Sequence, residues 1–262
     1  MTERRYDEGG VQLTIAGALA TITLDRADAL NAQTPHTWAA LSEVGRSLPA
    51  DVRAVVIRGA GRAFSAGLDR RMFSPDGVPG TVGMAELARL PQAEADALLE
   101  RYQQAFTWQR RPDLVTIAAV QGHAVGAGLQ LALACDIRVL ADDALLCMAE
   151  TTLGVVPDLG GTKALVSIVG PSRALEICLT GRRVSATEAM DLGLASLVVP
   201  VADLDSAVGD LVAALLSPPR GAVTETKALI YAAAARSAAE QEAAERSAQL
   251  RRLRELTGAL ET

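Results

Sequence analysis

The sequence predicts an α/β fold that ends in a helical region, and three observations support this class. Stretches of β-forming residues are repeatedly followed by a glycine turn and then by a helical pattern. A charge-free run from Leu114 to Cys135 contains this order of strand, turn and helix in one segment. The segment 222–252 is rich in alanine with charges scattered along it, which is typical of a helical region.

The N-terminal part of the chain contains a predicted hairpin, a helix and a strand. The hairpin is formed by VQLTI at 11–15 and ATITLDR at 20–26. Thr34 and Pro35 supply a cap and a first-turn proline for the helix that follows. RAVVIR at 53–58 is a predicted strand that runs into a glycine turn and then into FSAGLDR.

The charge-free run comes after a predicted loop at 74–83 and a predicted long helix at 92–110. It begins with β-forming residues, carries Gly122, Gly126 and Gly128 in its middle, and ends in an aliphatic stretch that can be buried on every side. A helix that begins at such a turn presents unpaired backbone N–H groups and the positive end of its dipole. This arrangement suits an anion or a carbonyl oxygen that gains negative charge.

A membrane span and a dinucleotide-binding loop both fit the charge-free run poorly. A membrane span needs this length, but glutamine, histidine and glycine residues dilute the apolarity, and the chain has no second such segment. A dinucleotide-binding loop needs a further glycine at the position of Leu131. We therefore expect a turn that stabilises negative charge, in a protein without a membrane span.

The C-terminal half continues with short strands and helices. DIRVLADD at 136–143 and ALLCMAE at 144–150 resemble strands, and a capping box that starts at Ser185 opens a helix. The order of elements predicts a main unit at 1–200 and a helical region at 201–262.

The composition excludes several classes of protein. With 262 residues, half of them hydrophobic, the chain can bury a large core. The net charge of −6 argues against a nucleic-acid partner. The N-terminus lacks the apolar core of a secretory signal, so we expect a cytoplasmic protein. The three cysteines lie in aliphatic surroundings that fit reduced, packed thiols, and together with the two histidines they predict no metal site.

Three motifs follow one another along most of the chain. They are FSAGLD at 64–69, QGHAVGAGLQLALACDI at 121–137 and ETTLGVVPDLGGT at 150–162. In this order and spacing they closely resemble the crotonase family, also called the enoyl-CoA hydratase/isomerase family, and 179–200 resembles its connection into the C-terminal helices. The resemblance implies a crotonase-like spiral of ββα repeats, a C-terminal helical region that mediates trimer contacts, and an acyl-CoA thioester as substrate.

The resemblance also implies an oxyanion hole made of two backbone N–H groups. By motif position these groups belong to Leu68 and to Ala127, which lies between Gly126 and Gly128. The residues agree with this assignment, because both positions lie at glycine turns and the second lies at a helix start.

The acids decide which reaction is expected. Family hydratases use two glutamates twenty residues apart, and here the first position holds Gln130 while the second holds Glu150. Glutamine cannot exchange a proton, so the carboxylate pair of ordinary hydration is incomplete, and Gln130 is expected to shape the substrate pocket together with Gly126 and Gly128. Asp158 follows eight residues after Glu150, and this pair resembles dienoyl-CoA isomerases, whose third acid would stand at position 130.

Some of these residues could instead have purely structural roles. Asp158 could cap the next helix, and Glu150 could be a carboxylate whose hydrogen bonds are satisfied. Asp69 is expected to cap the helix after the first turn, and Asp136 and Arg138 are expected to form a polar pair or a solvated strand end.

The resemblance implies CoA contacts at Arg26, Ala66 and Lys227. Lys227 stands where related chains often present a CoA-binding lysine, although Arg26 and Lys227 could instead be solvated. No separate cofactor is expected, because coenzyme A is part of the substrate. The expected partners are an acyl-CoA and further copies of the chain in a homotrimer or homohexamer, without nucleic acid or membrane.

Together these features predict an acyl-CoA enzyme that shifts a double bond of an enoyl-CoA, or of a dienoyl-CoA, through a thioester enolate. In this prediction Leu68 and Ala127 stabilise the oxyanion, and Glu150 and Asp158 transfer the proton. Two alternatives stay open: an enoyl-CoA hydratase that adds water to a 2-enoyl-CoA, and a non-catalytic acyl-CoA-binding protein.

Overall fold

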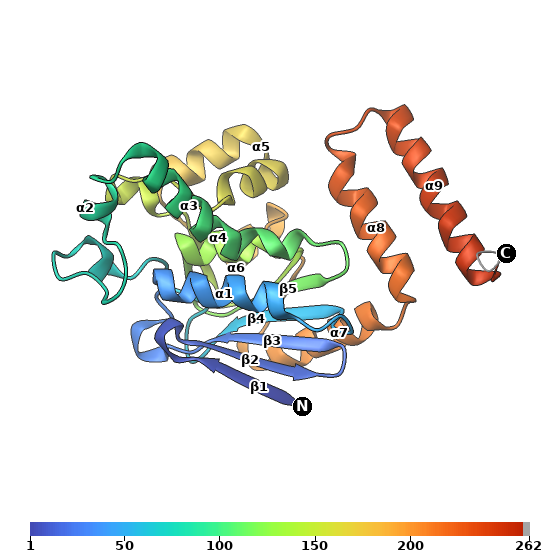
Figure 1. Ribbon diagram of the computed structural model, residues 1–262, viewed down its shortest axis with the longest axis horizontal. Coiled ribbons are helices and arrows are strands. Elements are labelled where there is room, and N and C mark those ends of the chain that lie inside the picture. The colour runs from blue at the N-terminus through green and yellow to red at the C-terminus, as the bar shows by residue number, and fades with distance from the viewer. Residues whose placement is uncertain (259–262) are drawn as a thin grey trace.

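The computed structural model describes residues 1–258, and a seven-stranded sheet lies at its centre (Figure 1). The strands follow the order β1-β2-β3-β4-β5-β7-β10. Their bounds are β1 Thr2–Tyr6, β2 Val11–Ala16, β3 Leu19–Leu24, β4 Ala54–Gly59, β5 Val115–Val120, β7 Ile137–Ala141 and β10 Leu197–Val199. β1, β2 and β3 pair in antiparallel fashion, which confirms the predicted hairpin, and the strands from β3 to β10 run parallel.

The central strands are apolar because both of their faces are covered. Every residue of β5 is buried. In β4, Val55 and Ile57 belong to one apolar core, and Ala54 and Val56 belong to a second. Successive side chains of a strand point to opposite faces, so the sheet separates two apolar layers.

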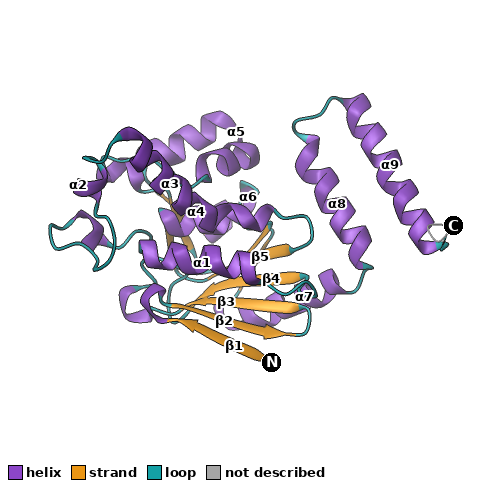
Figure 2. Cartoon of the chain, in the orientation of Figure 1, coloured by secondary structure: helices purple, strands orange, loops and turns teal. Residues whose placement is uncertain are grey.

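Helices cover both layers. α1 (Pro35–Ser47), α3 (Gln92–Thr107) and α4 (Ala127–Ala134) lie on the upper side of the sheet in Figure 2 and contribute to the larger core. α7 (Leu204–Leu216) covers the opposite face with buried leucine and valine side chains. The other helices are α2 Met84–Leu87, α5 Gly161–Thr180, α6 Ala186–Asp191, α8 Arg220–Ala233 and α9 Ala238–Leu256.

A second, three-stranded sheet aligns the segments that carry the site. It consists of β6 (His123–Val125), β8 (Leu145–Cys147) and β9 (Arg183–Ser185). β6 and β8 are parallel, with Val125 opposite Cys147. The turn after β6 therefore lies beside the segment after β8, which leads to Glu150.

The helices after residue 200 pack in two different places, which the sequence does not predict. α7 packs on the main sheet, whereas α8 and α9 form a helical hairpin that stands to one side of the sheet (Figure 1). The expected boundary at residue 200 therefore falls before a helix of the core, and the hairpin begins at Arg220. The helical segment predicted for 222–252 is two helices, because Ser237 starts α9 with a capping box to Glu240.

Most other expected elements are present, and the α/β class with a helical C-terminal region is confirmed. Thr34 caps α1, as expected, while the long helix predicted for 92–110 ends at Thr107 and continues as a short 3-10 turn. β1 is not predicted by the sequence, because its residues are mostly exposed and pairing with β2 holds it at the sheet edge. No helix within residues 1–258 is long and apolar enough to cross a membrane.

Candidate active site

The first glycine turn follows β4 and is held by the buried Ser65. Its Oγ donates to the carbonyl oxygen of Asn31 over 2.8 Å and accepts from the N–H of Gly67 over 3.2 Å. Gly67 has a φ of +87°, and a Cβ at this position would overlap the carbonyl oxygen of Val125. The turn therefore requires glycine at 67, and the next backbone N–H is that of Leu68.

The second glycine turn joins β6 to α4. Gly126 has a φ of +53°, and Ala127 is the first residue of α4. Gly128 lets α4 approach the first turn, because a Cβ there would lie 2.6 Å from the carbonyl oxygen of Ser65. A hydrogen bond of 3.0 Å from the N–H of Val125 to the same Ser65 oxygen also joins the two turns.

Leu68 and Ala127 present the two backbone N–H groups named as oxyanion donors. Neither group donates to a backbone or side-chain acceptor within residues 1–258. The two turns lie close together, since a Cβ on Gly67 would be 3.5 Å from the nitrogen of Ala127. An oxygen bound here could receive both N–H groups and the positive end of the α4 dipole.

Glu150 lies against the second turn and is only 8% exposed. Its Oε1 accepts from Nε2 of Gln130 over 2.7 Å, and a Cβ on Gly126 would lie 3.3 Å from the same oxygen. Its buried Oε2 has no hydrogen-bond partner among residues 1–258, so the acid is not fully satisfied. Burial raises the pKa of Glu150, and the negative charge of Asp158 adds a smaller contribution in the same direction.

Gln130 connects Glu150 to the segment that carries Asp158. The Gln130 Oε1 accepts from the backbone N–H of Leu159 over 2.9 Å and of Gly161 over 3.1 Å. Glycine at 161 leaves room for this contact, because a Cβ there would lie 2.6 Å from Cγ of Gln130. Nothing in the local sequence indicates these bonds, since their partners are separated by about thirty residues of chain.

Asp158 lies at the exposed end of this arrangement. It does not cap α5, because Gly160 occupies the N-cap position and no side chain caps that helix end. Its backbone oxygen accepts from Nε2 of Gln103 over 2.7 Å, a contact that the sequence does not predict. The residue as a whole is exposed, but surrounding protein desolvates its carboxyl group and raises its pKa. A capping role for Asp158 on α5 is therefore wrong.

Arg26 and Ala66 both belong to the surroundings of the first turn. The Arg26 guanidinium donates to Oδ2 of Asp69 over 2.9 Å and is half-buried rather than fully solvated. Asp69 also accepts from the N–H of Arg71 over 3.1 Å, which confirms that it caps the 3-10 helix at 70–73. The side chains of Arg71 and Arg26 hold the pKa of Asp69 well below its usual range.

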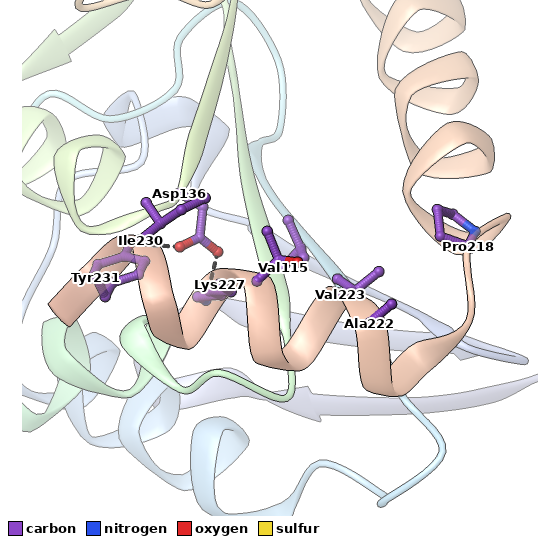
Figure 3. A pocket seen from close by; sticks show the side chains of 9 residues that line it. Val115, Asp136, Pro218, Ala222, Val223, Lys227, Ile230 and Tyr231 are labelled. Atoms are coloured by element: carbon purple, nitrogen blue, oxygen red, sulfur yellow. Dashed lines mark hydrogen bonds and ion pairs between the residues drawn. The ribbon is translucent and has the colours of Figure 1, made fainter. Parts of the chain in front are cut away.

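Lys227 is buried, with 7% of its surface exposed. Its ammonium donates to the carbonyl oxygens of Gln109 over 2.9 Å and Leu114 over 2.6 Å. It also donates to Oδ2 of Asp136 over 2.7 Å (Figure 3). An ammonium group has three N–H donors, so these contacts use all of them. The expected CoA contact of Lys227 is therefore not met by this geometry, and Lys227 instead holds α8 against the core.

Asp136 does not form the expected pair with Arg138. Its carboxylate accepts from Lys227, from the hydroxyl of Tyr231 over 2.5 Å and from the N–H of Thr116 over 2.7 Å. The guanidinium of Arg138 donates to backbone carbonyl oxygens instead. The sequence does not indicate the cluster of Lys227, Asp136 and Tyr231, because Lys227 and Tyr231 lie more than ninety residues after Asp136.

An apolar cavity of about 520 Å³ lies beside this cluster, between α8 and the core (Figure 3). It reaches Val115, the first residue of β5, whereas Ala127 comes after the other end of that strand and after β6. The cavity therefore lies at the opposite end of β5 from Ala127 and is not part of the candidate site. Its lining residues are Val115, Asp136, Pro218, Ala222, Val223, Thr226, Lys227, Ile230 and Tyr231.

The candidate site thus combines two backbone N–H donors with a buried acid and a more exposed acid. Such a set can stabilise an enolate oxygen and move a proton. Within residues 1–258, no group of three or more His, Cys, Asp or Glu side chains is placed to hold a metal ion.

Comparisons with solved structures extend this description. A protein from Thermobifida fusca YX, provisionally named an enoyl-CoA hydratase, matches with a TM-score of 0.90 and 49% identity, covering 96% of this chain and 95% of that chain. A structure of the same name, in complex with acetoacetyl-CoA, matches with a TM-score of 0.89 and 49% identity, covering 95% and 96%. These matches confirm the crotonase-like fold.

Two curated relatives represent different reactions. A mitochondrial protein of Dictyostelium discoideum, provisionally named an enoyl-CoA hydratase, is 35% identical over 193 residues, which are 72% of this chain and 63% of the relative. A peroxisomal Δ(3,5)-Δ(2,4)-dienoyl-CoA isomerase of Arabidopsis thaliana is 35% identical over 186 residues, which are 69% of this chain and 64% of the relative. The matched region spans less than two thirds of each of these relatives.

A family profile gives the broadest match. The profile described as Enoyl-CoA hydratase/isomerase matches residues 14–255, which include both glycine turns and both acids. The chain therefore belongs to the enoyl-CoA hydratase/isomerase family.

Proposed function

We propose that this chain is an acyl-CoA enzyme that shifts a carbon–carbon double bond of an enoyl-CoA through a thioester enolate. The observation that carries the proposal is the position of Glu150, a buried acid whose Oε2 is uncommitted within residues 1–258. It lies beside the turn of Ala127, and its neighbour at 130 is a glutamine rather than a second carboxylic acid. This arrangement fits proton transfer between carbons better than activation of water by two carboxylates.

The proposed reaction removes one proton from carbon, returns one proton to another carbon, and consumes no co-reactant. The thioester oxygen accepts from the N–H groups of Leu68 and Ala127. One carboxylate of the Glu150 and Asp158 pair removes a proton from carbon, and the C–H electron pair moves into the conjugated thioester to form an enolate. The other carboxyl group returns a proton at the far end of the conjugated system, so the double bond shifts. Each N–H donor is expected to contribute about 10²–10³ in rate.

The proposed substrate is a CoA thioester, which makes coenzyme A part of the substrate. Family membership supports this class, and so do the Thermobifida fusca structures, which were solved with acetoacetyl-CoA and with CoA. Arg26 and Ala66, next to the first turn, are the proposed contacts for CoA. The nucleotide part contributes binding away from the reacting carbons, so a CoA ester should bind far better than its free acid.

A hydratase is the second candidate function. Glu150 occupies the position of one of the two glutamates of family hydratases, and the Dictyostelium discoideum relative is provisionally named as such an enzyme. Addition of water to a 2-enoyl-CoA would then depend on Glu150 alone or on Glu150 with Asp158.

A single assay separates these candidates. The protein is incubated with 2-hexenoyl-CoA, 3-hexenoyl-CoA and 3,5-octadienoyl-CoA, and double-bond migration and water addition are followed together by liquid chromatography and mass spectrometry. Migration without hydration is the expected result. Hydration without migration would establish the second candidate, and saturable binding with neither product would identify a non-catalytic acyl-CoA-binding protein.

A further inference from the structure

The side-chain amide of Gln130 has one possible orientation. The amide atom that faces away from Glu150 accepts hydrogen bonds from the backbone N–H groups of Leu159 at 2.9 Å and Gly161 at 3.1 Å. Only the carbonyl oxygen of an amide can accept two hydrogen bonds, because the NH₂ group is solely a donor. The NH₂ group must therefore point at Glu150, and it does so over 2.7 Å.

This orientation determines which oxygen of Glu150 can carry a proton. Oε1 faces a donor and must accept, both in the carboxylate and in the carboxylic acid. The carbonyl oxygen of a carboxylic acid is a better acceptor than its hydroxyl oxygen, so a proton on Glu150 is favoured on Oε2, the buried oxygen without a partner in the described chain. The same amide ties Glu150 to the segment 159–161, which follows Asp158 directly.

We infer that Gln130 is a positioning residue that orients Glu150 so that Oε2 carries the exchanged proton. Gln130 also fixes the position of the segment that follows Asp158 relative to Glu150. The catalytic meaning of this inference rests on the proposed function above. Two glycines accommodate the arrangement, since a Cβ on Gly126 would crowd Glu150 and a Cβ on Gly161 would crowd Gln130. Gln130 as a whole is also only 1% exposed, so water has little access to replace its amide.

Few other titratable groups act on Glu150. α4 contributes only the neutral Gln130. Asp158 raises the pKa of Glu150 from the segment before α5, and the thiols of Cys147 in β8 and Cys178 in α5 lie close enough to be influenced by its charge. A pH titration of Glu150 is therefore sensitive to the group at 130.

Gln130→Glu isolates the positioning role. One carboxylate oxygen at 130 can still accept from Leu159 and Gly161, so the segment 159–161 keeps its anchor. The other oxygen would face Oε1 of Glu150 at the distance where the amide now donates, and two such carboxyl groups must share a proton. The pair should then titrate with an apparent midpoint about one pH unit or more higher than that of the wild type.

Infrared spectroscopy measures this without substrate. The carbonyl stretch of protonated Glu150 is identified by its loss in Glu150→Gln and is then followed against pH. The pH profile of deuterium exchange into 3-hexenoyl-CoA should move in the same direction. Gln92→Glu, at an exposed position at the start of α3, makes the same chemical change and should leave both midpoints unaltered. An unchanged infrared midpoint in folded Gln130→Glu would overturn the inference.

A second variant tests the link to the Asp158 segment. Gln130→Met keeps the length of the side chain but removes the carbonyl acceptor. The backbone amides of Leu159 and Gly161 should exchange with solvent deuterium about tenfold faster than in the wild type, as for loss of one hydrogen bond. Unchanged protection would contradict the link. Neither measurement requires turnover, so an infrared shift in a protein that shows no isomerisation would refute the reaction while supporting the positioning.

Discussion

Backbone geometry matters more than side-chain identity at the two turns. Gly67 and Gly126 both have positive φ values, and each has a neighbour in the space that a Cβ would need. The residues that follow, Leu68 and Ala127, contribute N–H groups rather than side chains. A change that removes an N–H should therefore cost more activity than one that alters only the side chain.

Ala127→Pro tests this at the first position of α4. Proline is well tolerated at the first turn of a helix, so the variant should fold, yet it lacks the N–H donor. Turnover should fall by about 10²–10³. Ala127→Gly keeps the N–H and is the matched control, with a much smaller loss. Steady-state kinetics on proteins of equal circular dichroism make the comparison, and full activity in folded Ala127→Pro would contradict the enolate mechanism.

The two acids are tested by changes that keep their size. Asp158→Asn and Glu150→Gln remove proton exchange, so each should lower kcat by about 10²–10⁴ and leave acyl-CoA affinity nearly unchanged. Deuterium exchange at the α- and γ-carbons of the substrate reports proton transfer even where net turnover is slow. If exchange persisted at the wild-type rate in the double variant, the assignment of both acids would be wrong.

Glu150 should also make stability depend on pH. Its pKa is raised in the folded protein, chiefly by burial, so the folded state holds the proton after the unfolded chain has lost it. Stability therefore falls as pH rises from the usual glutamate pKa through the raised one. Glu150→Gln removes this loss, and its carbonyl oxygen can still accept from Gln130. Its Tm should exceed that of the wild type by a few degrees at neutral pH, with the difference shrinking below the usual glutamate pKa, in calorimetry across that range.

At the level of secondary structure, the hydrogen bonds of one buried lysine attach α8 to the core. The ammonium of Lys227 lies among two carbonyl oxygens and Asp136, next to the apolar cavity along α8 (Figure 3). The guanidinium of Arg53 adds hydrogen bonds to the carbonyl oxygens of Leu216 and Pro218, just before the helix. Burial lowers the pKa of Lys227, while Asp136 opposes that change.

Lys227→Met should therefore weaken the attachment of α8 without changing CoA binding. The substitution removes the cation from the largely buried Asp136, and breaking a buried ion pair in this way costs about 3–5 kcal/mol. Urea unfolding measures this loss, and Lys163→Met, at an exposed position of α5, should be nearly neutral. Calorimetric titration of the folded variant with an acyl-CoA should give the wild-type Kd. Weaker binding with unaltered stability would restore Lys227 as a CoA contact.

At the scale of the whole molecule, the surface carries many large apolar side chains. Nine of them lie on α5, on the 3-10 turn after Ala149 and on the α8–α9 hairpin: Leu153, Val166, Leu175, Leu179, Ile230, Tyr231, Leu250, Leu253 and Leu256. Exposed apolar residues gathered on a few elements mark surfaces for association. The hairpin, which stands beside the sheet, is well placed to contact a second copy (Figure 1).

We therefore expect a homotrimer or a homohexamer. Light scattering after size exclusion should give a mass that is a multiple of three copies of the 27.3 kDa chain. The mass should persist on dilution to micromolar concentration. A stable monomer at that concentration would contradict the assembly prediction. The chemistry proposed for the site is tested separately, by the variants above.

Short-range signals account for the parts that could be predicted. The turns at Gly67 and Gly126 follow β-forming stretches, and glycine at such points indicates a positive φ or a close backbone approach. The apolar run of β4 and the cap at Thr34 likewise depend on signals within a few residues. The two acids could be named from motif spacing, and the structure places Glu150 beside the second turn.

Long-range contacts account for the rest. The role of Gln130 depends on N–H groups near residue 160, and Lys227 finds its partners beside Asp136, far earlier in the chain. Such partners carry no local signal, because a buried polar group must be satisfied by whatever the packed chain brings within reach, and sequence distance does not limit that choice. The sequence also does not indicate that α7 belongs to the core, because only its packing against the sheet shows this.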